Sequence, residues 1–93
     1  MFGLIMGSIL SIKNKIRNRV RNKRKMMKLS QEELAKRSGV SFGSIKRFES
    51  TSEISLTSLL KVAVALESEE DFYSLFSRKN YQSLQEVIDE AEK

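Results

Sequence analysis

Two helix boundaries that lie very close together constrain the fold of this 93-residue chain more than any other feature. Ser30 and Glu33 have the spacing of a capping box, which predicts the start of one helix. Gly39 predicts its end, because glycine adopts left-handed backbone at no steric cost. Ser41 is then a second N-cap. The two predicted helices, residues 31–37 and 41–49, are joined so tightly that they must cross at a steep angle.

The rest of the sequence favours helices throughout. The chain has no proline, and residues with high helix propensity are plentiful. Apolar residues spaced three and four apart predict one helix over residues 9–20, and Ser55 predicts the N-terminus of another. On the helix that follows Ser55, the side chains expected to face the core are Leu56, Leu59, Leu60, Ala63 and Leu66. Ser68 and Asp71 predict a further helix that carries Phe72, Leu75 and Phe76. The expected fold class is all-α, with about five helices and an extra C-terminal helix.

The two ends of the chain differ from its middle. Residues 1–10 are apolar but too few to span a bilayer, which takes about twenty. We interpret them as a disordered leader or as the start of the first helix, ahead of a domain at 11–79. Residues 80–93 form a predicted amphipathic helix whose apolar stripe covers its own domain, forms a dimer seam or docks a protein partner. The stripe consists of Tyr81, Leu84, Val87, Ile88 and Ala91.

Charge is distributed unevenly along the chain. Residues 1–50 contain 13 Lys and Arg against 3 Asp and Glu, whereas residues 51–93 contain 4 against 9. The basic half is either a solvated surface or the site of an anionic partner. Since nine cations between positions 13 and 28 have no acid among them and repel one another, the sequence favours an anionic partner.

Several kinds of chemistry are excluded by composition. The chain has no Cys and no His, which removes disulfides, thiolate nucleophiles, Cys/His zinc sites and histidine acid–base catalysis. No pair of carboxylates stands in a context that would tune it for catalysis. We therefore expect no catalytic residue, no metal, no cofactor and no membrane partner, and the reducing cytoplasm suits such a chain.

The segment LSQEELAKRSGVSFGSIKRFE, residues 29–49, resembles the helix-turn-helix of the Xre, or lambda-repressor-like, family. The resemblance extends over about residues 16–76. It implies a DNA-binding fold in which the helix from Ser41 enters the major groove of double-stranded DNA and the preceding helix crosses the backbone. The base-contacting positions that it implies are Ser41, Phe42, Gly43, Ser44, Lys46 and Arg47.

Two of these positions have more than one interpretation. Phe42 either places its ring against thymine methyl groups or belongs to the core. Gly43 stands where the family carries a polar side chain, and it indicates either close approach to the DNA backbone or weak sequence discrimination. Arg47 has the geometry for a bidentate contact with guanine.

Other positions are implied to hold the domain on DNA or to hold it together. The expected phosphate contacts are Ser30, Gln31, Ser50, Lys23, Lys25 and Lys28. Arg24 and Glu49 match positions that form an ion pair inside lambda-like repressors.

The stretch GSIKRFESTSEISLTSLLKVAVAL, followed by DFYSLF, resembles the antitoxins that accompany Hip-type kinase toxins. This resemblance implies a homodimeric repressor that controls its own toxin–antitoxin operon and binds a Hip-type kinase. The alternative is a protein-interaction module that neutralises the kinase, with DNA binding secondary. In either case the chain is expected not to be an enzyme.

Overall fold

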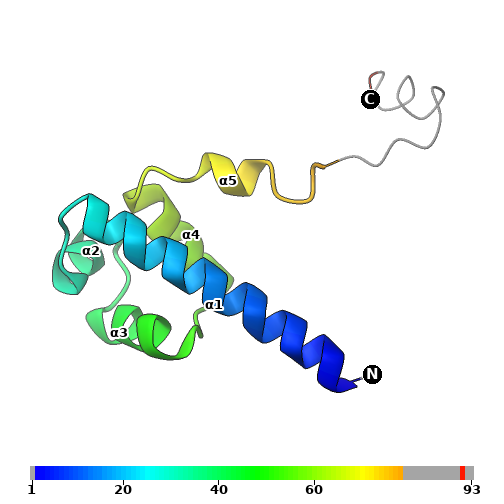
Figure 1. Ribbon diagram of the computed structural model, residues 1–93. Coiled ribbons are helices and arrows are strands. Elements are labelled where there is room, and N and C mark those ends of the chain that lie inside the picture. Colours follow the sequence, from blue (N-terminus) through cyan, green and yellow to red (C-terminus); the bar gives the residue numbers. More distant parts are fainter. Residues whose placement is uncertain (1, 79–90, 92–93) are drawn as a thin grey trace.

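The computed structural model describes residues 2–78 and residue 91. Within this part of the chain all regular structure is helical, and it comprises five helices (Figure 1). Their bounds are α1 (Phe2–Met26), α2 (Gln31–Ser38), α3 (Phe42–Thr51), α4 (Leu56–Ala65) and α5 (Glu70–Tyr73). The expectation of an all-α fold is confirmed for the described residues. The helix expected over residues 80–93 lies outside the described residues, apart from the exposed Ala91.

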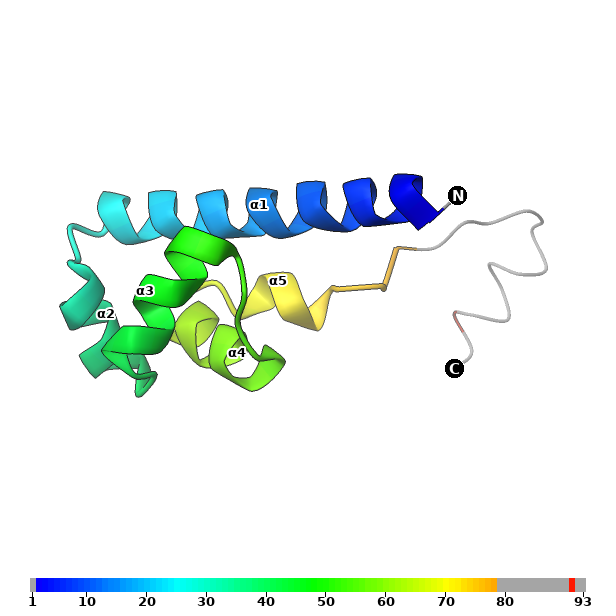
Figure 2. The same ribbon diagram turned by 90° about the horizontal axis from the view of Figure 1, so that it is seen from below.

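Helix α1 is much longer than the sequence pattern predicted. It has 25 residues, which corresponds to about 37 Å. Its C-terminal half lies over α2, α3 and α4, whereas its N-terminal half projects beyond them (Figure 2). Residues 2–10 are therefore the start of this helix in the structure, which agrees with one of the two interpretations of the apolar N-terminal segment. The boundary proposed between residues 10 and 11 stays a prediction.

Helix α1 ends with a C-terminal capping motif that contains no glycine. Lys28 has φ 60°, a left-handed conformation. The Lys28 amide donates to the carbonyl of Lys25 at 2.9 Å, and the Leu29 amide donates to that of Arg24 at 3.1 Å. This is a Schellman motif, which satisfies carbonyls that the helix end leaves open. The turn directs Leu29 into the core and starts the chain toward α2.

The caps of α2 and α3 are those predicted from sequence. The Glu33 amide donates to Ser30 Oγ and the Ser30 amide donates to Glu33 Oε1, both at 3.0 Å. Gly39 ends α2 with φ 76°, and its amide donates to the Ala35 carbonyl. Ser41 Oγ accepts from the Ser44 amide at 3.1 Å. The two helix ends therefore fix the short turn between α2 and α3.

Helix α4 begins as predicted but presents a different face to the core. Ser55 Oγ accepts from the Ser58 amide. The fully buried side chain is Val62, however, while Leu56 and Leu60 are exposed by 65% and 37%. The expectation that these two leucines face inward is wrong, because α4 carries apolar residues on almost every side and its periodicity selects no single face.

The predicted helix after Ser68 is reduced to one turn. Helix α5 begins at Glu70 and lacks a side-chain cap. The Ser68 hydroxyl donates instead to the Leu66 carbonyl at 3.0 Å, so Ser68 continues the end of α4. Leu75 and Phe76 follow α5 as exposed residues. The predicted Ser68–Asp71 capping motif is therefore wrong.

One small core joins the helices. Its buried members come from the α1–α2 turn, α2, the α2–α3 turn, α3 and α4: Leu29, Leu34, Val40, Ile45, Val62 and Leu66. Val20 of α1 and Ala35 of α2 pack against this cluster. Among the described residues, no helix is long and apolar enough to cross a membrane. The core holds α2 and α3 in a fixed crossing and leaves the outer side of α3 open.

Candidate nucleic-acid interface

Helix α3 has one buried side and one exposed side. Ile45, Phe48 and Glu49 are buried, and they fall at the spacing of one helical face. Five of the six predicted base-contacting residues are exposed: the N-cap Ser41 and, on the helix, Phe42, Gly43, Lys46 and Arg47. The helix thus holds a polar and partly basic surface outward on a rigid element.

The ring of Phe42 is not part of the core. It is 40% exposed, and Lys46 Nζ lies 5.3 Å from its centroid. A cation at this distance from an aromatic face is attracted by the ring's electron density. The interpretation of Phe42 as a core aromatic is therefore wrong. Phe42 and Lys46 instead place an aromatic ring and a positive charge next to each other on the surface.

Gly43 and its two serine neighbours have different structural roles. A Cβ built on Gly43 would have no neighbouring atom within 4 Å, so packing within the chain does not require glycine there. Ser41 caps α3, and its hydroxyl also donates to Ser44 Oγ at 2.8 Å. Both serines therefore stabilise the N-terminus of α3. The resemblance to the Xre family assigns this same N-terminus to DNA contact.

Glu49 joins three helices from the inner side of α3. Its side chain is 3% exposed. Arg24 of α1 donates from Nε to Oε2 and from Nη2 to Oε1, both at 2.8 Å, which is a bidentate pair. Gln31 of α2 donates from Nε2 to Oε1 at 3.1 Å. Arg21 of α1 donates from Nη2 to the Glu49 carbonyl oxygen at 2.6 Å. Glu49 therefore sets the position of α3 relative to α1 and α2.

The environment of Glu49 keeps it ionised. Burial by itself raises the pKa of this carboxyl, but hydrogen bonds from Arg24 and Gln31, the charge of Arg24 and the hydrogen bond from Arg21 lower it more. The resulting pKa lies below the ordinary value of 4.5. Arg24 also donates from Nη1 to the Leu29 carbonyl at 2.8 Å. Within the described residues, no buried side-chain nitrogen or oxygen lacks a hydrogen-bond partner.

Arg21 is a site residue that the sequence analysis missed. It lines a shallow polar notch of about 310 Å³ whose other walls come from the start of α2 and from α3: Gln31, Lys46, Arg47, Glu49 and Ser50. The side chain of Arg21 is 37% exposed, so it reaches both Glu49 and the surface. Helical spacing is the signal that would have found it, because Arg21 precedes Arg24 by three residues on α1.

The predicted phosphate-contacting residues do not all lie together. Gln31 and Ser50 line the notch, although the Gln31 amide group is already bound to Glu49. The Ser50 hydroxyl donates to the Arg47 carbonyl at 3.1 Å. Ser30 caps the adjacent start of α2. These three residues therefore surround the same corner of the molecule.

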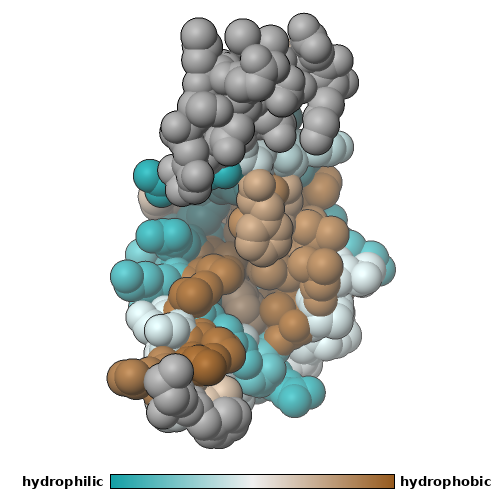
Figure 3. Space-filling model, turned by 90° about the vertical axis from the view of Figure 1, so that its right-hand side faces the viewer, coloured by the Kyte–Doolittle hydropathy of each residue, from teal (hydrophilic) through white to brown (hydrophobic). Residues whose placement is uncertain are grey.

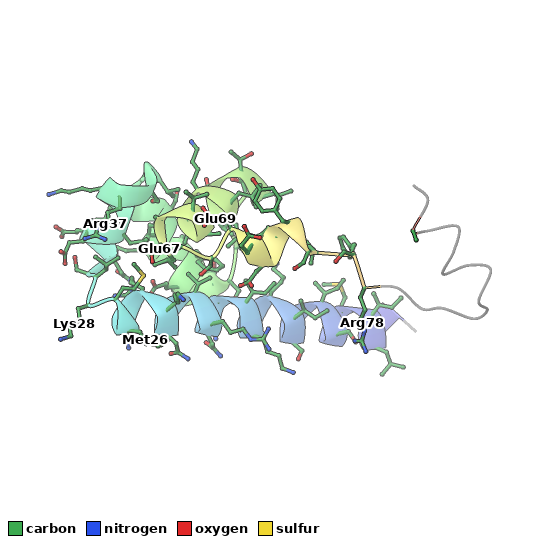
Figure 4. The ribbon with its side chains drawn as sticks, turned by 90° about the horizontal axis from the view of Figure 1, so that it is seen from above. Met26, Lys28, Arg37, Glu67, Glu69 and Arg78 are labelled. Atoms are coloured by element: carbon green, nitrogen blue, oxygen red, sulfur yellow. The ribbon has the colours of Figure 1, made fainter. Side chains whose placement is uncertain are left out.

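The three predicted lysines are placed differently from one another. Lys23 lines a cavity between α1 and the α4–α5 pair, on the side of α1 opposite Arg21 by helical spacing. Lys25 follows Arg21 by one turn and is exposed. Lys28 occupies the turn after α1, at the end of the molecule remote from Arg78 (Figure 4). The structure therefore separates Lys23 from the notch.

Only one residue of the apolar stripe predicted to form a dimer or partner surface belongs to the described part of the chain. Tyr81, Leu84, Val87 and Ile88 lie outside the described residues, and Ala91 is exposed. Among the described residues, no group of His, Cys, Asp and Glu is arranged to hold a metal ion.

Two short helices crossing at a tight turn, with the second presenting an exposed outer side, define a helix-turn-helix domain. The helix-turn-helix family model HTH_3 matches residues 20–73, more than half of the chain. The chain therefore belongs to this family, which is lambda-repressor-like and consists of DNA-binding transcription regulators. No curated protein and no solved structure matches the chain.

Proposed function

We propose that this protein is a homodimeric repressor that recognises a specific DNA sequence with the outer side of α3. The observation that carries the proposal is the division of α3 into a buried side, fixed through Glu49, and an exposed side with Phe42, Lys46 and Arg47. A helix of this kind fits the major groove. Arg47 offers a bidentate donor to guanine, and the Phe42 ring offers an apolar surface to thymine methyl groups.

The notch beside α3 supplies the proposed phosphate contacts. Arg21 and Lys46 bring positive charge to it, and the start of α2 brings unpaired backbone N–H groups. Phosphate contacts fix the register of a protein on DNA without reading its sequence. Arg21 is therefore proposed as a phosphate contact in addition to Ser30, Gln31, Ser50, Lys25 and Lys28.

Homodimer formation is supported by an apolar surface on the far side of the domain. Leu56, Val64 and Tyr73 are exposed by 65%, 57% and 81%. They border a hollow of about 440 Å³ between α4 and α5. A second copy placed on this surface would bury it and present two α3 helices to successive turns of the duplex.

A role as antitoxin rests on sequence alone. The stretch over residues 43–66 resembles the antitoxins of Hip-type kinase toxins. This resemblance supports binding of such a kinase and repression of the shared operon. Mixing the purified protein with such a kinase tests this second candidate function: co-elution with loss of kinase activity is expected, and a kinase that stays active and elutes separately contradicts it.

The repressor proposal is tested by mobility shift on the DNA upstream of the protein's own gene. The control DNA is a scrambled sequence of equal length and composition, and both are measured at two salt concentrations. We expect tighter binding to the upstream DNA at both salt concentrations, because base contacts are less sensitive to salt than phosphate contacts. Equal binding to both sequences, lost as salt rises, would contradict sequence-specific repression.

A further inference from the structure

An apolar groove separates α1 from α4 and α5. It contains an open cavity of about 510 Å³, lined mainly by Ile16, Val20, Leu59, Leu66, Phe72 and Leu75. Figure 3 shows apolar side chains on both sides of a hollow on this face of the molecule. Since a cavity of about 150 Å³ holds benzene, the groove has room for roughly three aliphatic side chains.

The rim of the groove is positively charged along α1. Arg19 and Lys23 line it, while Asp71 lies on the α5 side. Below this rim, the apolar face of α1 continues along its projecting N-terminal half through Ile9, which is 40% exposed. The groove therefore fits an amphipathic segment with aliphatic side chains on one side and carboxylates on its flanks.

The C-terminal segment of the same chain has this composition. Leu84, Val87 and Ile88 fall at helical spacing on one side, and Ser83 with Glu86 forms a predicted capping box. Residues 80–93 carry four carboxylates and one lysine. Their negative charge complements the arginine and lysine on the groove's rim.

The described chain ends where such a segment would enter. Leu75 lines the cavity, and the described chain continues to Arg78. Residues 79–82 then connect Arg78 to the predicted helix start at Ser83. The whole connection from the end of α5 at Tyr73 to Ser83 is residues 74–82, nine residues; this is slightly longer than the two to eight residues usual between packed helices, so it is long enough for the chain to turn back into the groove.

We infer that residues 83–91 form a helix that packs into the groove between α1 and α5 of their own chain. Leu84, Val87 and Ile88 enter the cavity, and the flanking carboxylates lie near Arg19 and Lys23. A short connection gives the segment an effective concentration on the order of millimolar at the groove. The segment is therefore part of the domain's own core, and the dimer surface is left to the exposed side of α4 and α5.

Disulfide trapping tests this inference, because the natural chain has no cysteine. The test variant combines Ile16→Cys with Val87→Cys. The matched control combines Asn18→Cys with Val87→Cys, since Asn18 is exposed and lies on the opposite side of α1. Both full-length variants are oxidised at micromolar concentration, and the products are separated on non-reducing gels and mapped by mass spectrometry.

We expect the Ile16 variant to form an intrachain disulfide at a rate independent of protein concentration, and the Asn18 variant to form none comparably fast. Equal trapping of the two variants would overturn the inference, because the segment would then sample both sides of α1. Predominant interchain disulfides in the Ile16 variant would overturn it as well, because a second copy would then occupy the groove.

Urea unfolding gives a second, independent measurement. Ile88→Asp should lower the unfolding midpoint, whereas Gln85→Asp, which adds the same charge on the polar side of the segment, should leave it unchanged. Equal effects of the two substitutions would contradict packing of Ile88. Neither measurement involves DNA, so the outcome is separate from that of the proposed function.

Discussion

Among the ion pairs that connect α1 to the end of α3 and its following loop, Arg24–Glu49 and Lys13–Glu53 differ in almost everything except their charges. Arg24 and Glu49 are 11% and 3% exposed and are joined by two hydrogen bonds of 2.8 Å. Lys13 and Glu53 also form an ion pair, but their side chains are 32% and 51% exposed. Within the described residues, the first pair belongs to a fully hydrogen-bonded core, and the second lies at the surface.

This difference teaches that burial, more than the presence of a pair, decides what an ion pair does for the domain. Water solvates Lys13 and Glu53 whether or not they meet, so little is gained when they do. Glu49 is buried, so removing Arg24 takes away its bidentate partner and leaves the charge inside the protein with only the longer contacts of Arg21 and Gln31. The position of α3, and hence of its exposed side, therefore depends on the buried pair.

The largest effect is expected from Glu49→Ala. The substitution leaves Arg24 buried without its partner and should lower the free energy of unfolding by about 3–5 kcal/mol, measured by urea denaturation. Glu53→Ala is the matched control and should shift the midpoint little. A Glu49→Ala variant as stable as the Glu53→Ala variant would show that the two pairs do not differ as described.

Replacing both buried partners should cost less than removing one. Arg24→Met combined with Glu49→Leu removes both charges and keeps apolar volume in the core, and such exchanges are often close to neutral. We expect the double variant to be about 2 kcal/mol more stable than Glu49→Ala. Its circular dichroism should remain helical. A double variant less stable than Glu49→Ala would mean that Glu49 contributes more than charge compensation.

The next largest difference between the two ion pairs is expected in the pH dependence of stability. The pKa of Glu49 is lowered in the folded protein from an ordinary value of 4.5, so the unfolded chain takes up the proton first. The stability that this group contributes is complete above about pH 4.5 and is lost as the pH falls through the folded pKa. Glu49→Gln should flatten the fall of the urea midpoint below pH 4.5.

Glu53 provides the comparison for this measurement. Its pKa is also lowered, by the hydrogen bond and charge of Lys13, but it is exposed, so Glu53→Gln should change the pH profile less. Parallel profiles for the wild type and Glu49→Gln would contradict the account of the buried carboxylate.

The smallest effect is expected from Lys13→Ala. The pair with Glu53 is solvated and screened by salt. The unfolding midpoint should fall slightly at low salt and match the wild type at high salt. A loss that persists at high salt would show that Lys13 contributes through packing of its aliphatic chain.

Sequence alone predicted the elements whose signals are local. Ser30, Ser41 and Ser55 cap α2, α3 and α4 as expected, because a cap involves only residues within one turn. The helix ends marked by Lys28 and Glu67 escaped prediction, and the end marked by Ser52 lies beyond the predicted end of that helix at residue 49. Each adopts left-handed backbone without glycine, so the residue type gave no signal.

The parts that sequence could not predict depend on tertiary contacts. Helix α4 is apolar nearly all round, and only packing against α2 determines that Val62 faces inward. Arg21 looked like one more cation in a basic run, yet it lies between Glu49 and the notch. The Ser52 hydroxyl, buried and donating to Asn14 Oδ1 at 2.7 Å, likewise joins residues distant in sequence.

The central claim is that the outer side of α3, held in place by the buried Glu49, reads DNA bases. The most direct test compares binding of preferred and scrambled DNA by wild type, Arg47→Ala and Arg78→Ala at one salt concentration. Arg78 is the control because it is exposed and follows α5, at the end of the molecule remote from Lys28 (Figure 4).

We predict that Arg47→Ala loses about 1–3 kcal/mol of discrimination, while Arg78→Ala keeps the wild-type ratio of affinities. If Arg47→Ala weakened binding to both DNAs equally and left their ratio intact, Arg47 would be a phosphate contact and α3 would not read bases through it.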